Sequence, residues 1–189
     1  MNVFLTFFLL LIMSAMNLFG QDSTAELKTV NTVNIERYAG RWYEIAKYPN
    51  RFQKSCVSDT TADYVLKSNG RIAVTNRCLK KDGKINRAVG EAKIVDKQTN
   101  AKLKVRFAPG FLSALPVVWG DYWIIELPED YSYAVVAEPG RDYFWILSRK
   151  PEMEDKTYQA ILTRAEAMGF KPSRVERTIQ KTASGRTTE

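Results

Sequence analysis

The sequence predicts an all-β protein: an eight-stranded antiparallel up-and-down β-barrel with one C-terminal α-helix packed outside and a short ninth strand. Two observations lead to this prediction. Eight short strand-like runs follow one another between residues 40 and 150, and short connections separate them. The apolar spacing then changes to that of a helix. Closing the eight strands into a barrel removes the exposed edges that such a sheet would otherwise carry.

Turn residues set the limits of the predicted strands. Asn69-Gly70 separates the second strand from the third and strongly indicates a hairpin, and Asp82-Gly83 separates the third from the fourth. The predicted strands, in chain order, are residues 40–48, 57–67, 71–79, 84–95, 101–108, 117–127, 131–138 and 143–150.

The predicted helix follows the last strand. Pro151 suits a first helical turn, and Gly169 is typical of the residue that ends a helix. Between them, apolar residues recur at helical spacing: Tyr158, Ile161, Leu162, Ala165 and Met168. Residues 174–180 are the candidate ninth strand, and residues 181–189 are a polar, flexible tail.

The first twenty residues have the features of a signal peptide. Their apolar stretch is shorter than the roughly 20 residues that a membrane-spanning helix needs, and small residues follow it. We expect cleavage after Gly20 and a flexible segment over residues 21–33; the alternative is an uncleaved membrane anchor. Because the mature chain would begin with Gln21 and not with cysteine, we expect no lipid anchor there. The protein is therefore predicted to be exported, periplasmic or secreted, and soluble.

The composition bears on several classes of function. The chain has 189 residues, which fits one domain after a leader, and it contains no histidine. Without the usual zinc or haem ligand and the usual general base, we predict no metal, no cofactor and no catalytic residue. The formal net charge of +7 is compatible with an anionic partner or surface. Lysines and arginines are scattered and no helix has a basic face, so nucleic acid is not a predicted partner.

The up-and-down topology assigns each connection to one of two ends of the barrel. Trp42, at the start of the first strand, and Arg149, at the end of the last, both fall at the end that we call the base. A guanidinium stacked on the indole would close this end. Cys56 and Cys78 both fall near the opposite end, the mouth, and fit a disulfide of an oxidising compartment. A hairpin centred on Asn69-Gly70 would place Thr61, and not Cys56, opposite Cys78, so the disulfide requires a bulge or a fold-back of the preceding loop; otherwise two free thiols remain.

Strand alternation indicates which side chains face the interior. In the fifth strand Leu103, Val105 and Phe107 oppose the basic phase Lys102, Lys104 and Arg106, and charges on the outer face exclude a barrel embedded in lipid. The sixth strand leaves two alternatives: Tyr122 and Ile124 face inward, or Trp123 and Ile125 do. The other candidates for the interior are Ala62, Tyr64, Leu66, Ile72 and Val74, together with Trp145 and Leu147 if Arg149 is turned toward the base.

Three short motifs resemble those of the lipocalin family. Gly40-Arg41-Trp42-Tyr43 resembles the first motif, Asp130-Tyr131 the second, at the turn between strands six and seven, and Arg149 the third. The resemblance covers residues 34–180 and is greatest to the bacterial lipocalin and apolipoprotein D group. Bacterial members of this group often carry a lipid-modified cysteine where this chain has Gln21.

The resemblance implies a cavity that binds fatty acids or lysophospholipids, and it favours Tyr122 as an inward residue. We therefore predict ligand contacts, or else plain core packing, for Tyr64, Val74, Val105, Phe107, Tyr122, Val136 and Trp145. The function predicted is non-catalytic binding and transport or storage of such a ligand in the cell envelope. An interaction scaffold without a ligand and a lipid-modifying enzyme are the alternatives, with Glu44 and Glu126 as possible buried carboxylates. The apolar loop over residues 110–116 either contacts a membrane or caps the pocket.

Overall fold

The computed structural model describes residues 26–181. The predicted signal peptide over residues 1–20 and nearly all of the predicted tail over residues 181–189 lie outside the described residues.

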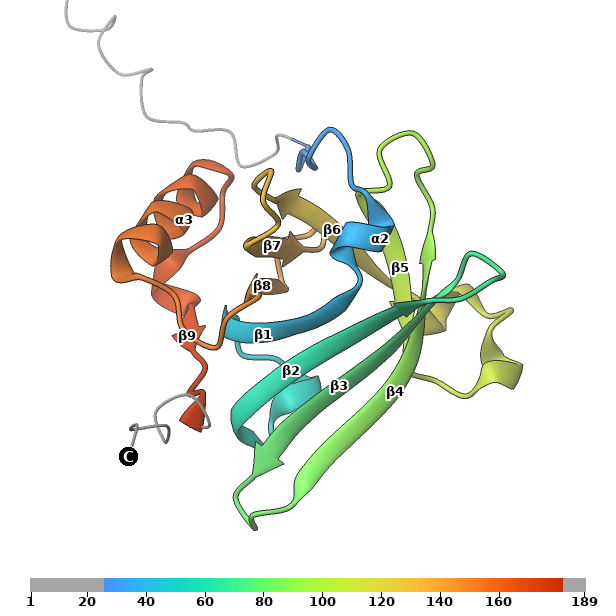
Figure 1. Cartoon of the computed structure of the whole chain (residues 1–189), viewed down its shortest axis with the longest axis horizontal. Coiled ribbons are helices and arrows are strands. Elements are labelled where there is room, and N and C mark those ends of the chain that lie inside the picture. Colours follow the sequence, from blue (N-terminus) through green and yellow to red (C-terminus); the bar gives the residue numbers. More distant parts are fainter. Residues whose placement is uncertain (1–25, 182–189) are drawn as a thin grey trace, which may run out of the picture.

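Eight antiparallel strands form a closed barrel, as predicted (Figure 1). The strands are β1 Gly40–Lys47, β2 Cys56–Leu66, β3 Ile72–Lys80, β4 Ile85–Ile94, β5 Lys102–Arg106, β6 Gly120–Glu126, β7 Tyr133–Ala137 and β8 Phe144–Ser148. Each pairs with the next along the chain, and β1 pairs with both β8 and β2, which closes the cylinder. The short predicted ninth strand is β9, Glu176–Arg177, and it pairs with β1.

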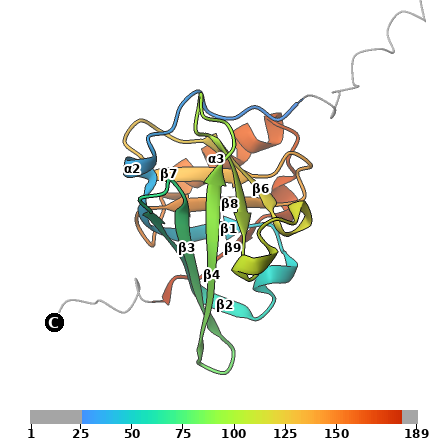
Figure 2. The same ribbon diagram turned by 90° about the vertical axis from the view of Figure 1, so that its right-hand side faces the viewer.

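Helices lie at the connections and outside the barrel. They are α2 Ile35–Tyr38, α3 Asp155–Ala167 and the 3-10 turns η1 Arg51–Gln53, η2 Gly110–Leu112, η3 Pro116–Val118 and η4 Pro172–Arg174. Figure 1 shows α3 outside the barrel, and Figure 2 shows β3 and β4 on the side away from it. The predicted helix is confirmed, but its start at Pro151 is wrong: the first helical backbone hydrogen bond runs from Tyr158 N to Glu154 O, so the helix begins at Asp155.

The hairpin between β2 and β3 has a three-residue turn. Lys67 N donates to Arg71 O, and Gly70 has a φ of +76°, a conformation that glycine adopts without a steric penalty. The turn therefore shifts the pairing by one residue. Thr61 lies opposite Arg77, whereas the prediction placed it opposite Cys78. Register shifts on both sides of Ser58 bring Cys56 beside β3, and the predicted Cys56–Cys78 disulfide is formed.

Two apolar clusters lie on the two faces of the barrel wall. The inner cluster fills the barrel toward its base and includes Trp42, Ile124 and Val136, all 0% exposed. The outer cluster joins α3 to the wall: Tyr158, Ile161 and Ala165 pack with residues that include Phe144 and Ile146. The strands β6, β7 and β8 contribute to both clusters, so one face of each is buried inside the barrel and the other beneath α3.

The base of the barrel is closed by Arg149 and Trp42, as predicted. The guanidinium carbon of Arg149 lies 3.7 Å from the centre of the Trp42 ring. Its Nη1 donates to Arg41 O (2.9 Å), and its Nη2 donates to the carbonyls of Arg37 (2.6 Å) and Tyr38 (3.1 Å). A Cβ on Gly40 would lie 3.4 Å from Arg149 Nη1, and Gly40 has a φ of +95°, so both space and conformation favour glycine in the first motif.

The segment before the barrel contacts its wall. Leu27 and Val33 are 3% and 1% exposed. Val30 N donates to Ile124 O (3.0 Å), and Val33 N donates to Thr99 O (2.7 Å). A flexible segment was expected over residues 21–33. Residues 21–25 lie outside the described residues, and the expectation did not include these contacts of residues 27–33.

The C-terminal segment joins two strands that separate toward the mouth. Beyond Tyr43, β1 no longer pairs with β2, and Thr178 N donates to Ile45 O (2.9 Å) on one side. Asp59 N of β2 donates to Ile179 O (2.8 Å) on the other. Gln180 Nε2 donates to both Glu44 O and Thr60 O, so residues 178–180 bridge β1 and β2.

Replacing Arg149 with alanine is expected to destabilise the fold by about 2–4 kcal/mol, because it removes a cation–π contact and charged hydrogen bonds to three carbonyls. The measurement is the free energy of unfolding in urea. Lys150→Ala at the exposed neighbouring position is the control, with an expected change below about 0.5 kcal/mol. Equal losses in the two variants would contradict a structural role for the stack.

Candidate functional site

The barrel places six of the seven predicted ligand residues in or against the inner cluster: Tyr64, Val74, Val105, Tyr122, Val136 and Trp145. The register explains this arrangement, because Tyr64 pairs with Val74 across β2 and β3, and Val136 pairs with Trp145 across β7 and β8. Directly paired residues point to the same face of a sheet. Whether these side chains contact a ligand stays a prediction.

Phe107 lies apart from these six residues. Its side chain is 44% exposed, and it lies against Gly90, where a Cβ would come within 2.6 Å of the Phe107 Cδ1. Gly90 shares the inward face of β4 with Ala92, so Phe107 covers the inner wall beyond the cluster, near the mouth.

The orientation of β6 decides between the two alternatives left by its sequence. Tyr122 and Ile124 face the inner cluster, whereas Trp123 and Ile125 belong to the outer cluster beneath α3. The outward basic phase of β5 is also as predicted, since Lys104 forms an ion pair with Asp121 at 2.9 Å on the outer face.

Three tyrosine hydroxyls meet inside the barrel. Tyr122 Oη lies 2.7 Å from Tyr38 Oη and 3.0 Å from Tyr64 Oη. Burial raises the pKa of Tyr64 to about 12, and it raises the pKa values of Tyr38 and Tyr122 well above their usual range. The three groups therefore remain neutral phenols that can donate or accept hydrogen bonds. Tyr38 comes from α2, and no feature of the sequence pointed to it.

A second polar group lies toward the mouth. Glu44, which is 3% exposed, accepts hydrogen bonds from Thr178 Oγ1 (2.6 Å) and Gln53 Nε2. Gln53 Oε1 in turn accepts from Trp145 Nε1 (3.1 Å) and Asn50 Nδ2 (2.7 Å). Burial raises the pKa of Glu44, although both hydrogen bonds and nearby Lys47 act in the opposite direction. Glu126, the other carboxylate considered, pairs with Arg164 of α3 at 2.6 Å.

The connection between β5 and β6 exposes apolar side chains. Phe111 and Val117 are 84% and 87% exposed, and Leu115 is 48% exposed. These three side chains therefore do not fold over the interior as a cap.

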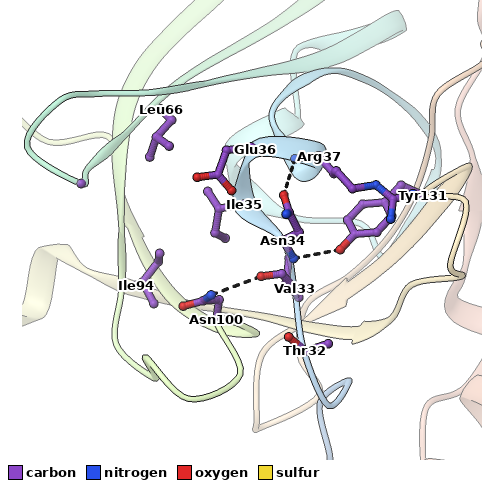
Figure 3. Close-up of a pocket in the computed structure, with 11 residues that line it drawn as sticks. Thr32, Val33, Asn34, Ile35, Glu36, Arg37, Leu66, Ile94, Asn100 and Tyr131 are labelled. Carbon is purple, nitrogen blue, oxygen red and sulfur yellow. Dashed lines mark hydrogen bonds between the residues drawn. The ribbon is translucent and has the colours of Figure 1, made fainter.

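A pocket of about 620 Å³ lies at the base, opposite the mouth (Figure 3). Val33, Ile35, Leu66 and Ile94 provide its apolar surface, and Figure 3 shows Glu36 directed toward them. Arg37 is turned toward Tyr131, with 4.1 Å between its guanidinium carbon and the ring centre. Tyr131 and its neighbour Asp130 form the predicted second motif, so this motif holds the segment that closes the base; Asn34 N donates to Tyr131 Oη (2.8 Å).

Neither a metal-binding cluster nor a membrane-spanning helix is found among the described residues. Within residues 26–181, no group of three or more cysteine, aspartate or glutamate side chains could hold a metal ion. In the same part of the chain, no helix has the length and apolar character needed to cross a membrane.

Comparison with known proteins identifies relatives across most of the chain. A family described as "Lipocalin-like domain" matches residues 33–180. Temperature-induced lipocalin-1 of Arabidopsis thaliana is 43% identical over 157 residues, covering 82% of this chain and 83% of the relative. Outer membrane lipoprotein Blc of Escherichia coli is 37% identical over 146 residues (77% and 78%), and apolipoprotein D of Rattus norvegicus is 40% identical over 133 residues (66% and 65%).

The fold also resembles solved structures. Insecticyanin of the tobacco hornworm Manduca sexta superimposes with a TM-score of 0.63 at 21% identity, over 80% of this chain and 83% of that one. At this identity the likeness concerns the fold alone.

The buried carboxyl of Glu44 is expected to make stability depend on pH. Because its pKa is raised in the folded protein, folding favours the protonated form. This contribution is fully present below the pKa of an unfolded glutamate and is lost as the pH rises through the folded pKa. Glu44→Gln should therefore gain stability relative to the wild type between about pH 4 and pH 7. Urea unfolding of both proteins across this range measures the difference, and a constant difference would contradict the assignment.

Proposed function

The chain belongs to the lipocalin family, and on this premise we propose that it binds a small hydrophobic ligand inside the barrel and transports or stores it without catalysis. The ligand that we propose is a fatty acid or a lysophospholipid. The observation that carries the proposal is the distribution of polar groups on an otherwise apolar inner face. Neutral tyrosine hydroxyls lie together at one level, and the Glu44–Gln53–Trp145 network lies toward the mouth.

Such an interior suits an acyl chain with a polar end. Each buried methylene contributes about 0.8 kcal/mol, so a long chain can bind by burial, while a few polar groups orient its end. We propose that the inward residues Tyr64, Val74, Val105, Tyr122, Val136 and Trp145 contact the chain and that Phe107 contacts it near the mouth.

We propose that this function is carried out outside the cytoplasm, in the periplasm or as a secreted protein. The Cys56–Cys78 disulfide supports an oxidising compartment. The Escherichia coli relative is named an outer membrane lipoprotein, which supports the cell envelope as the setting. We propose in addition that the exposed loop over residues 110–116 contacts a membrane transiently during ligand exchange.

A scaffold without a ligand is the second candidate, and it would give a protein from which no lipid can be extracted. A lipid-modifying enzyme has less support. The chain has no histidine, and its two cysteines form the disulfide, so neither a Ser-His nor a Cys-His pair is available.

Enlarging an inward side chain should weaken ligand binding. Val105→Phe adds volume inside the barrel, whereas Val89→Phe adds it at a position of β4 that is 56% exposed. We expect Val105→Phe to bind oleic acid and a lysophospholipid at least about tenfold more weakly, and Val89→Phe to bind them like the wild type. Native mass spectrometry and quenching of tryptophan fluorescence measure the binding. Absence of binding by the wild type, or equal loss in both variants, would refute an interior site.

The membrane contact requires its own test. Phe111→Ser/Leu115→Ser should reduce flotation of the protein with phosphatidylcholine vesicles, because these side chains supply buried apolar area at the bilayer. Val95→Ser/Ile179→Ser, at positions 46% and 58% exposed elsewhere on the molecule, is the control and should float like the wild type. Unchanged flotation of the loop variant would contradict a role for this loop.

A further inference from the structure

The outer wall of the barrel carries a group of cations stacked on one tryptophan. Trp119 follows η3 and is 7% exposed. The Nζ of Lys93 lies 4.4 Å from its ring centre, and the guanidinium carbons of Arg106 and Arg71 lie 5.2 and 5.5 Å away. We call Lys67, Arg71, Lys93, Arg106, Glu91 and Trp119 the Trp119 surface.

Positive charge exceeds negative charge on this surface. Glu91 is its single carboxylate, and three cations share it: Lys67 at 3.1 Å, Arg106 at 3.3 Å and Arg71 at 3.6 Å. Lys93 forms no ion pair within residues 26–181. Arg71 Nη1 and Arg106 Nε make no hydrogen bond in this part of the chain, but both atoms are buried, and Arg71 Nη1 lies 3.6 Å from Glu91 Oε2. The surface therefore carries a net positive charge, which an anionic group would balance at its more exposed cations.

The Trp119 surface is continuous with the exposed apolar loop. Arg106 Nη1 donates to Ala108 O (2.7 Å) where the loop begins, and Trp119 Nε1 donates to Ser113 O (2.9 Å) inside it. Residues 108–119 contain no charged side chain. The loop projects from the ends of β5 and β6 on the side of the barrel that carries β4 (Figures 1 and 2). Cations and exposed apolar side chains thus lie next to each other.

This combination favours one kind of partner. A bilayer offers hydrocarbon to Phe111 and Val117 and, at its surface, phosphate oxygens to neighbouring Lys and Arg side chains. A nucleic acid would satisfy the cations but would leave these two apolar side chains in water. A soluble anion would do the same.

We propose that the Trp119 surface binds the headgroups of anionic phospholipids and thereby holds the adjoining wall of the barrel and the 110–116 loop against the membrane. This inference rests on the proposed membrane contact of the loop and assigns the lipid class that the contact selects. The loop supplies affinity for any bilayer, and the cations supply the preference for a negatively charged one.

The test compares two variants that lose the same charge. Arg71→Gln/Lys93→Gln removes two cations of the Trp119 surface, and Lys97→Gln/Lys156→Gln removes two exposed cations elsewhere. Flotation is measured with phosphatidylcholine vesicles and with vesicles that also contain phosphatidylglycerol. Each cation at a membrane surface contributes about fivefold to binding, so we expect the first variant to lose about 30-fold on anionic vesicles and nothing on neutral ones. The control should lose less than about threefold, because its charges are screened.

Several outcomes overturn the inference. Equal losses in the two variants would show that net charge alone acts, and unchanged binding of Arg71→Gln/Lys93→Gln would exclude the surface. If this variant has a lower melting temperature, Lys67→Gln/Lys93→Gln replaces it, since Lys67 is more exposed. Failure of the wild type to bind any vesicle would refute the membrane contact, whereas ligand binding in the barrel is tested separately by the Val105→Phe titration.

Discussion

The contact between Arg149 and Trp42 determines how the barrel is closed. It joins the last strand to the first, and its hydrogen bonds to Arg37 and Tyr38 also fix α2 across the base. Trp42 Nε1 donates to Tyr38 O (2.8 Å), so the indole is held by the same short helix that the guanidinium contacts. Tyr38 then places its hydroxyl beside Tyr122. The stacking of Arg149 on Trp42 therefore positions both α2, which covers the base of the barrel, and the Tyr38 hydroxyl, which belongs to the tyrosine group inside it.

The interior combines strong apolar burial with polar groups that mostly satisfy one another; within residues 26–181 the buried Asn76 Oδ1, on the inward phase of β3, has no hydrogen-bond partner. The tyrosine hydroxyls bond among themselves, and Glu44 is supplied by Gln53 and Thr178. Because these groups already have partners, an incoming ligand must exchange hydrogen bonds and gains little net energy from them. Affinity would then come mainly from burial of the ligand's acyl chain, and the polar groups would determine which polar end group the site accepts.

Most of the fold could be predicted because periodicity, turn residues and topology agree. The number and order of the strands, the meeting of Trp42 with Arg149 and the outward phase of β5 all follow from local patterns and parity. Details that depend on irregular backbone could not be predicted: the three-residue turn before β3, the position of the bulges whose need the disulfide had indicated, and α2. The polar segment over residues 26–33 also gave no sign that Leu27 and Val33 would be buried.

The candidate site was predictable to a similar degree. Alternation identified the inward phases of most strands, but in β6 both phases are apolar and aromatic, and only packing under α3 distinguishes them. Gln53 joins Glu44 to Trp145 from a connection, where no periodicity applies. The Trp119 surface was also missed, because its cations come from β4, β5 and the connection between β2 and β3 and are scattered along the sequence. Sequence spacing cannot show that they meet above one ring.

Residues 178–180 have a consequence for how the protein is made. They complete the wall where β1 and β2 separate, and they follow all eight barrel strands along the chain. Every strand up to β8 can therefore pair while this seam is still open toward the side. An assembly intermediate in which these residues have not yet docked therefore has an opening in its side wall that the complete domain lacks.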